Sequence, residues 1–464
     1  MNKSPLLPVL RAPHLMALSL VAIINLREYP LLATMGWQAV IYSVLAFLGF
    51  LLPSAWVCSQ LAGRYPSQGG LYTWFQQAFG DTFGCLGMAV EWLNNLISFP
   101  ATLAMMIATV MTVVMPTWQQ HTWLFAAATI ALCWLCVAIC SCGLHITNRI
   151  NVVAALLGIV LPTLLIIVLG FIWFVTGHPI VLEAPHFSLH SPSLFHLGLF
   201  VSVLSAYAGM QSSAFFAPRV SDPQRTYPKA LLSSAVIIFF LTVGAAMAIA
   251  IVVPASSINY VNGLMASFQA FFAVFHLSVL TPWVALLMVL GALAAVCTWM
   301  HALARGVHQM ALEEKLPAYF CRRNEREIPI RIIVLQGIII TLLIAVFLCV
   351  PDIQTVYWLF VLLTSQFTVL MYVALFAAAI KLLSGGGVAW KNRLTRLLAS
   401  LGIISSLFGL CASFSRPDHI AWSQKSYAWI IASSDAGLAV LLLLFFFVRL
   451  KGSNSLKTSR LGLQ

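Results

Sequence analysis

A cation and an anion stand side by side in the first apolar stretch of the chain. Arg27 and Glu28 interrupt a run that is otherwise apolar from residue 12 to residue 37. At about 1.5 Å per residue the run can cross a bilayer, where charged side chains are costly. Charges at this depth are tolerated where they line a watered cavity, and there they can bind the two ends of a zwitterion. A structural pair between Arg27 and Glu28 is the alternative interpretation.

Two apolar runs are expected to be broken helices. Pro30 cannot donate the hydrogen bond that continues a helix, so we expect an interruption beside Tyr29. Residues 204–214 of the sixth run are small or hydroxylated around Gly209, which lets a ligand approach the backbone. Small residues are also ordinary packing residues in membranes. An interruption at the same place in two successive five-span halves predicts an inverted-repeat transporter, with its site between the broken helices.

Further polar side chains occur in other apolar runs. Glu91 and Asn95 lie in the third run, and Glu91 is either a proton-coupling group or a hydrated residue near the end of a span. Trp299 in the eighth run can wall a cavity and offer a π face to a cation. His301 can carry a proton or be a hydrogen-bonded structural residue. Tyr372 belongs to a polar face of the tenth run, which either bonds neighbouring helices or lines a path.

These residues need a membrane-embedded scaffold to position them. The chain has 464 residues, only 8% of them charged, and a mean hydropathy of +0.97, which excludes a soluble globule. Apolar runs of at least about 18 residues predict an all-α integral membrane protein with twelve spans. The predicted spans are 12–37, 38–62, 84–115, 122–142, 150–175, 194–217, 229–253, 278–303, 328–350, 354–381, 394–414 and 427–449.

The positive charges report topology. The net charge is +12, and if the amino terminus is cytoplasmic, all Lys and Arg residues except Arg27, Arg416 and Lys425 lie in the tails and loops on that side. This distribution follows the positive-inside rule for a protein with both termini in the cytoplasm. A nucleic-acid partner is therefore not expected.

No metal or cofactor is expected either. Cys133, Cys136, Cys140 and Cys142 cluster on the fourth span, but no His or carboxylate joins them. A thiolate metal site is the alternative, and close packing of small apolar residues is the favoured interpretation.

Several stretches carry a resemblance to a known family. The loop residues 66–72, the segment 209–229, and residues 305–317 followed by Pro329 resemble the amino acid/polyamine/organocation transporter superfamily. Residues 28–30 and 33–36 look like its glutamate/gamma-aminobutyrate antiporter branch. Each motif is degenerate, but their order and spacing are specific and cover nearly the whole chain.

The resemblance implies a LeuT-like fold, a five-plus-five inverted repeat with broken helices 1 and 6. The repeats would be residues 1–182 and 183–385, and residues 386–464 would add two helices for packing or homodimerisation and a short tail. It implies that the substrate-binding residues are Arg27, Glu28, Tyr29, Asn95, Tyr207, Gly209, Gln211, Trp299 and Tyr372. The chain departs from the family where Gln211 and Ala295 replace acids, which weighs against glutamate specificity.

The predicted function is amino acid transport in the inner (cytoplasmic) membrane by alternating access. Exchange of amino acids, or of an amino acid for its decarboxylated amine, is the leading interpretation. Proton-coupled uptake is the alternative, with Glu28, Glu91 and His301 as proton-coupling candidates. A polytopic membrane enzyme, a channel or a non-transporting sensor belongs to other classes, and no nucleophile with a base in reach favours an enzyme. The expected partners are a small amino acid and membrane lipid.

Overall fold

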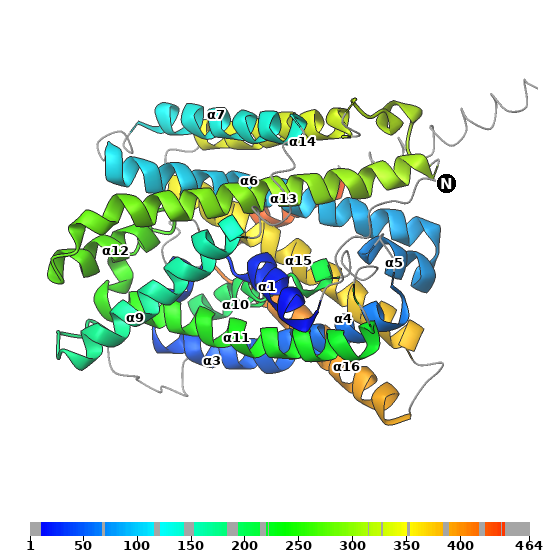
Figure 1. The fold of residues 1–464 in the computed structure, drawn as a ribbon, viewed down its shortest axis with the longest axis horizontal. Helices are drawn as coiled ribbons and strands as arrows, with labels where there is room; N and C mark the ends of the chain where they lie inside the picture. Colours follow the sequence, from blue (N-terminus) through cyan, green and yellow to red (C-terminus); the bar gives the residue numbers. More distant parts are fainter. Residues whose placement is uncertain are drawn as a thin grey trace, which may run out of the picture.

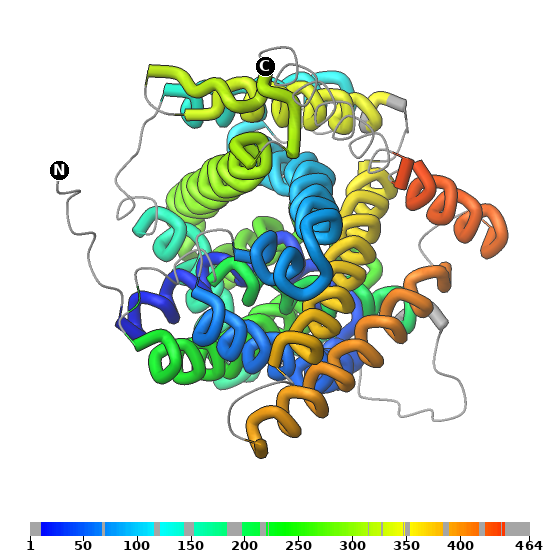
Figure 2. The backbone as a smooth tube through the Cα atoms, turned by 90° about the vertical axis from the view of Figure 1, so that its right-hand side faces the viewer, coloured from blue at the N-terminus to red at the C-terminus, as the bar shows by residue number. Residues whose placement is uncertain are grey.

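The protein is a bundle of long helices (Figures 1 and 2). The computed structural model describes residues 11–66, 70–115, 121–142, 153–182, 194–213, 220, 222–313, 315–325, 328–349, 353–383, 389–416, 423–437 and 439–440. The α-helices are α1 (Ala12–Ile23), α2 (Glu28–Ala33), α3 (Trp37–Ala46), α4 (Leu52–Arg64), α5 (Leu71–Phe79), α6 (Asp81–Val114), α7 (Thr122–Ser141), α9 (Leu161–Val175), α10 (Leu194–Ala206), α11 (Pro223–Val252), α12 (Gly263–Val274), α13 (Thr281–Leu312), α14 (Ile330–Cys349), α15 (Ile353–Leu383) and α16 (Ala389–Ala412).

The helices account for the predicted membrane spans. Among the described residues, eight helices are long and apolar enough to cross a bilayer, including the continuous stretch Trp37–Arg64 and the helix Asp81–Val114. The four other predicted spans are the two broken ones, α14, and a last helix described over residues 424–437. The eighth span extends to Leu312, nine residues beyond its predicted end at 303. The difference arises because charged residues end the apolar run, whereas the helix itself continues through them.

The first break is a short non-helical link. Helix α1 ends at Ile23 and α2 begins at Glu28, so residues 24–27 form the interruption. Pro30 lies inside the first turn of α2, where a helix leaves its N–H groups unpaired in any case. Its ring would clash with the carbonyl of Leu26 if the helix were continuous. Pro30 therefore marks the start of the second half-helix, not the interruption itself.

The second break contacts the first. Helix α10 ends at Ala206, and Gly209 follows with a φ of +127°, a conformation that side chains other than hydrogen rarely allow. A Cβ at Gly209 would lie 2.8 Å from Cγ1 of Ile23 and 3.2 Å from the carbonyl oxygen of Ala22. The absence of a side chain thus lets the two interruptions meet backbone to backbone.

Two long helices support the breaks from one side. Helices α6 and α13 run side by side, and α7 and α14 form a layer over them (Figures 1 and 2). Met88 of α6 packs against Gly306 of α13, where a Cβ would lie 2.5 Å from the Met88 methyl group. Asn95 lies two helical turns after Met88, and Trp299 lies two turns before Gly306. Asn95 and Trp299 therefore lie at the same height along the two helices. Helix α15 packs against α6 on another side.

Candidate functional site

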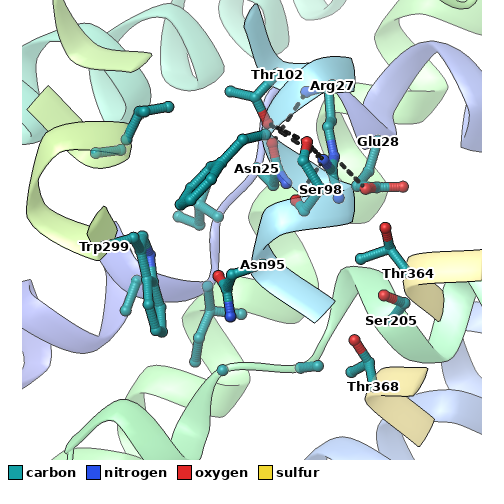
Figure 3. Close-up of a pocket in the computed structure, with 18 of the residues that line it drawn as sticks. Asn25, Arg27, Glu28, Asn95, Ser98, Thr102, Ser205, Trp299, Thr364 and Thr368 are labelled. Atoms are coloured by element: carbon teal, nitrogen blue, oxygen red, sulfur yellow. Dashed lines mark hydrogen bonds and ion pairs between the residues drawn. The ribbon is translucent and has the colours of Figure 1, made fainter. Parts of the chain in front are cut away.

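A cavity of about 150 Å³, lined by both polar and apolar residues, lies between the two helix breaks (Figure 3). A water molecule needs about 10–15 Å³ on the same measure, so the cavity holds about ten to fifteen non-hydrogen atoms. This is the size of an amino acid or a small amine. The polar residues and glycine that line it are Asn25, Arg27, Glu28, Glu91, Asn94, Asn95, Ser98, Thr102, Ser205, Gly209, Gln211, Thr364 and Thr368, and Trp299 adds an aromatic wall.

Arg27 is fixed at the first break by bonds to α6. Its Nη1 donates to the carbonyl oxygen of Ser98 at 2.9 Å, to the Ser98 hydroxyl at 2.7 Å and to the Thr102 hydroxyl at 3.2 Å. Its Nε donates to Oε1 of Glu28 at 2.9 Å, and both side chains of this ion pair are about 95% buried. Within the described residues, no hydrogen bond uses Nη2 of Arg27 or Oε2 of Glu28. One donor group and one acceptor therefore remain for a ligand.

Helix α6 presents a polar face to the cavity. Glu91, Asn95, Ser98 and Thr102 follow one another at intervals of three or four residues, which places them on one side of a helix. Asn95 Nδ2 donates to the Glu91 carbonyl at 2.9 Å, and Asn94 Nδ2 donates to the Thr368 hydroxyl at 2.9 Å. The polar face thus runs from Glu91 to the residues that hold Arg27.

The second break is held by a tyrosine of α15. The Tyr372 hydroxyl accepts hydrogen bonds from the backbone N–H of Gly209 at 2.9 Å and of Met210 at 3.1 Å. It donates to Oε1 of Gln211 at 2.5 Å, and the Gln211 side chain also faces the carboxylate of Glu91. The unwound backbone is therefore tied to a rigid helix, because its own N–H groups lack the partners that a continuous helix supplies.

Opposite walls of the cavity differ in character. Trp299 of α13 stands on one side, and Thr364 and Thr368 of α15 stand on the other, with Arg27 and Glu28 at a third (Figure 3). Asn95 projects between them at the level of Trp299. The cavity can therefore offer hydrogen bonds on one side of a ligand and an apolar, aromatic surface on the other.

The structure brings most of the predicted site residues together. Seven of the sequence candidates line the cavity: Arg27, Glu28, Glu91, Asn95, Gly209, Gln211 and Trp299. The three tyrosines lie behind its wall. Tyr29 shares a 3.1 Å hydrogen bond with Thr163, Tyr207 is fully buried in the core, and Tyr372 reaches the break as described above.

His301 stands apart from the cavity. It lies on α13, is half-buried, and is close to Cys297, which is itself near the thiols of Cys136 and Cys140 on α7. No group of three or more His, Cys, Asp or Glu side chains with metal-binding geometry occurs in the part of the chain that the structure describes. Residues 67–69 and 214–219, which carry parts of the motifs noted above, lie outside the described residues, as does the carboxyl-terminal tail.

Sequence reasoning did not name three polar lining residues of α6 as site residues: Asn94, which was expected only to face the bundle, Ser98 and Thr102. Their signal was present, because Ser98 and Thr102 continue the helical spacing of Glu91 and Asn95. A lone Ser or Thr in an apolar span usually bonds its own backbone, as the Thr102 hydroxyl does to the Ser98 carbonyl at 3.3 Å. Only their proximity to Arg27 distinguishes them.

Comparisons with known proteins show similarity to membrane transporters over most of the chain. A family model described as "Amino acid permease" matches residues 14–434. An uncharacterized transporter of Legionella pneumophila is 33% identical over 89% of this chain and 90% of its own length. A glutamate/gamma-aminobutyrate antiporter of Lactococcus lactis is 26% identical over 92% and 88%, and a probable agmatine/putrescine antiporter of the same species is 23% identical over 75% and 74%.

Solved structures show the same fold. The structure of MhsT in complex with L-phenylalanine matches with a TM-score of 0.57 at 16% identity, covering 86% of this chain and 98% of MhsT. A manganese transporter of Eremococcus coleocola matches with a TM-score of 0.53 at 12% identity, covering 96% and 95%. The predicted all-α, LeuT-like architecture with broken helices 1 and 6 is thereby confirmed.

Proposed function

Since this chain belongs to the amino acid permease family, a family of membrane transporters, we propose that it is an antiporter that exchanges amino acids, or an amino acid for its decarboxylated amine. The observation that supports this most strongly is the amino-acid-sized cavity between the two helix breaks, with polar groups on its lining. Its residues offer a cation, an anion and exposed backbone within one small volume. A zwitterion is the ligand that uses all three.

The proposed binding mode assigns each end of the substrate. Helix α1 ends beside the cavity, so its last carbonyl groups and Oε2 of Glu28 accept hydrogen bonds from the α-ammonium. Nη2 of Arg27 donates to the α-carboxylate. Trp299 and Asn95 then contact the substrate's side chain. In this role the Arg27–Glu28 pair is already neutral as a unit, so the pair itself favours a ligand without net charge.

The proposed transport cycle uses the two repeats, residues 1–182 and 183–385, each of which contributes one broken helix to the site. Rocking of one group of helices against the other would open the cavity to each side in turn. We place the protein in the inner (cytoplasmic) membrane with both termini in the cytoplasm, as the distribution of Lys and Arg favours. We assign the last two helices to packing or homodimerisation.

Proton-coupled uptake is the second candidate. It is favoured by Glu91, a buried carboxylate that lines the cavity and whose Oε2 has no hydrogen-bond partner within the described residues. A carboxylate of this kind can bind a proton together with the substrate. Glu28 is a weaker candidate because it is already paired with Arg27.

Purified protein in proteoliposomes separates these functions. Labelled amino acids should enter only when the vesicles contain unlabelled substrate, which is the result expected of an exchanger. Entry into empty vesicles driven by an inward proton gradient would identify a symporter instead. A chemically altered label would indicate an enzyme, and binding without entry would indicate a sensor.

A further inference from the structure

An open groove lies on the outside of the bundle, apart from the substrate cavity. Its volume is about 360 Å³, more than twice that of the cavity. One side is a face of α14, on which Arg331, Val334, Leu335 and Ile338 follow one another at intervals of three or four residues. Tyr319 of the short 3-10 helix η7 (Ala318–Cys321) also lines the groove. The groove is therefore apolar along α14 and charged at one end.

The groove runs from the membrane surface into one leaflet. Arg331 is the second residue of α14, and Ile338 lies seven residues farther, about 10 Å deeper along the helix axis. Half of the hydrocarbon core is about 15 Å thick. Helix α14 belongs to the outer layer of the bundle (Figures 1 and 2), and Ile338 is 44% exposed, so this face meets lipid. In the orientation proposed above, the leaflet is the cytoplasmic one.

Arg331 is held in the groove with one edge of its guanidinium group free. Its Cζ lies 4.0 Å from the centre of the Tyr319 ring, and its Nη1 donates to the Tyr319 carbonyl oxygen at 3.0 Å. Within the described residues, Nε and Nη2 of Arg331 make no hydrogen bond. These two nitrogens share an edge whose parallel N–H bonds match two oxygens of a phosphate. The side chain is thus positioned for an anion.

A second set of hydrogen bonds ties η7 to α13. Nδ1 of His308 on α13 lies 3.0 Å from the carbonyl oxygen of Phe320, and Nε of Arg323 donates to Nε2 of the same imidazole at 2.7 Å. A carbonyl oxygen only accepts, so Nδ1 carries the proton and Nε2 is the acceptor. The wall of the groove is therefore fixed before a ligand arrives, which lowers the conformational cost of binding.

The positive charge beside the groove is not balanced by carboxylates. None of Arg322, Arg323 and Arg331 forms an ion pair within the part of the chain that the structure describes. Arg322 directly follows η7 and is exposed. A basic groove at the membrane surface complements a ligand that combines a negative headgroup with hydrocarbon chains.

We propose that this groove is a binding site for an anionic phospholipid of the cytoplasmic leaflet. The Nε–Nη2 edge of Arg331 binds two phosphate oxygens, and Arg322 adds a second positive charge beside the headgroup. One acyl chain lies along the apolar face of α14. A zwitterionic phospholipid offers the same phosphate, but its own cation cancels the net charge that the two arginines attract. The proposal does not depend on which substrate the protein transports.

Native mass spectrometry of the purified protein tests the site. The protein is titrated in detergent with phosphatidylglycerol or with phosphatidylcholine of the same acyl chains. Phosphatidylglycerol should bind the wild type at least about fivefold more tightly. In Arg331→Gln the two affinities should agree within about twofold. Arg396→Gln is the matched control, because Arg396 is an exposed arginine of α16 outside the groove, and it should keep the preference of the wild type.

A conservative variant separates binding from folding. Arg331→Lys keeps the charge and a cation over the Tyr319 ring but lacks the paired edge, so the preference should fall by at least about threefold in a protein that folds normally. An unchanged preference in both Arg331 variants would overturn the site, as would equal binding of the two lipids by the wild type. Glycerol phosphate at the lipid's concentration should not displace phosphatidylglycerol. Displacement would identify a soluble phosphate as the ligand and overturn the lipid. Amino acid exchange can fail or succeed independently, because each readout is lipid binding.

Discussion

The hydroxyl of Tyr372 in α15 donates a 2.5 Å hydrogen bond to Oε1 of Gln211 in the second helix break. The Tyr372 hydroxyl oxygen also accepts hydrogen bonds from the backbone N–H groups of Gly209 and Met210. One side chain thus replaces the helical partners that the unwound segment lacks. The geometry of the cavity depends on this tie, although Tyr372 does not itself line the cavity.

Replacing Tyr372 by Phe should loosen the second break. Three buried groups lose their partner, and each unpaired group costs about 1–3 kcal/mol. We expect a lower melting temperature and substrate binding weakened by about tenfold or more. Thermal unfolding and equilibrium binding in detergent measure the two effects. Tyr427→Phe is the matched control, because the buried Tyr427 hydroxyl bonds the Ser413 carbonyl at 3.4 Å and does not contact the second break, and it should leave binding intact.

Substitutions of the Arg27–Glu28 pair should separate structure from binding. Arg27→Ala leaves Glu28 buried without a counter-charge, at a cost of about 3–5 kcal/mol, so the folded yield should fall. The double variant Arg27→Met/Glu28→Gln removes both charges and should restore the yield but not exchange activity. Size-exclusion profiles and proteoliposome counterflow report the two properties. Normal exchange by the double variant would reduce the pair to a structural role.

Gly209→Ala should abolish transport. The added Cβ meets Ile23 and the Ala22 carbonyl, and the positive φ of this position is strained for alanine. Gly177 has a φ of +72° but open space around its Cβ position, so Gly177→Ala carries backbone strain without a clash. We expect Gly177→Ala to cost about 1–2 kcal/mol of stability and to transport normally. Equal transport by both variants would show that the contact between the breaks is dispensable.

Trp299→Ala should weaken substrate binding while leaving the fold intact. Trp299 walls the cavity and is only half-buried, so its loss removes ligand contacts more than core packing. A drop in affinity of about tenfold is expected from equilibrium binding. Trp283 lies on the same helix, is 62% exposed and is distant from the cavity, so Trp283→Ala should bind as the wild type does. Unchanged affinity in Trp299→Ala would remove this residue from the site.

The sequence predicted the scaffold because its signals are local. Apolar runs, the clustering of Lys and Arg between them, and the small residues around Gly209 each report on a few neighbouring residues and on the bilayer, with no need for a partner elsewhere in the chain. The interruption of the first span was predicted for the same reason, although Pro30 lies in the first turn of α2 and the interruption precedes it. The polar spacing of α6 was also readable in the sequence.

The orientation of individual side chains was decided only by the tertiary structure. Tyr29 and Tyr207 stand beside the breaks in sequence, yet they point into the core, because each helix has one face toward the cavity and others toward its neighbours. The bonds between Arg27 and Ser98 join residues 71 positions apart, and those between Tyr372 and Gly209 join residues 163 apart. Such pairs form when packing brings distant helices together, and no local pattern encodes the distance between them.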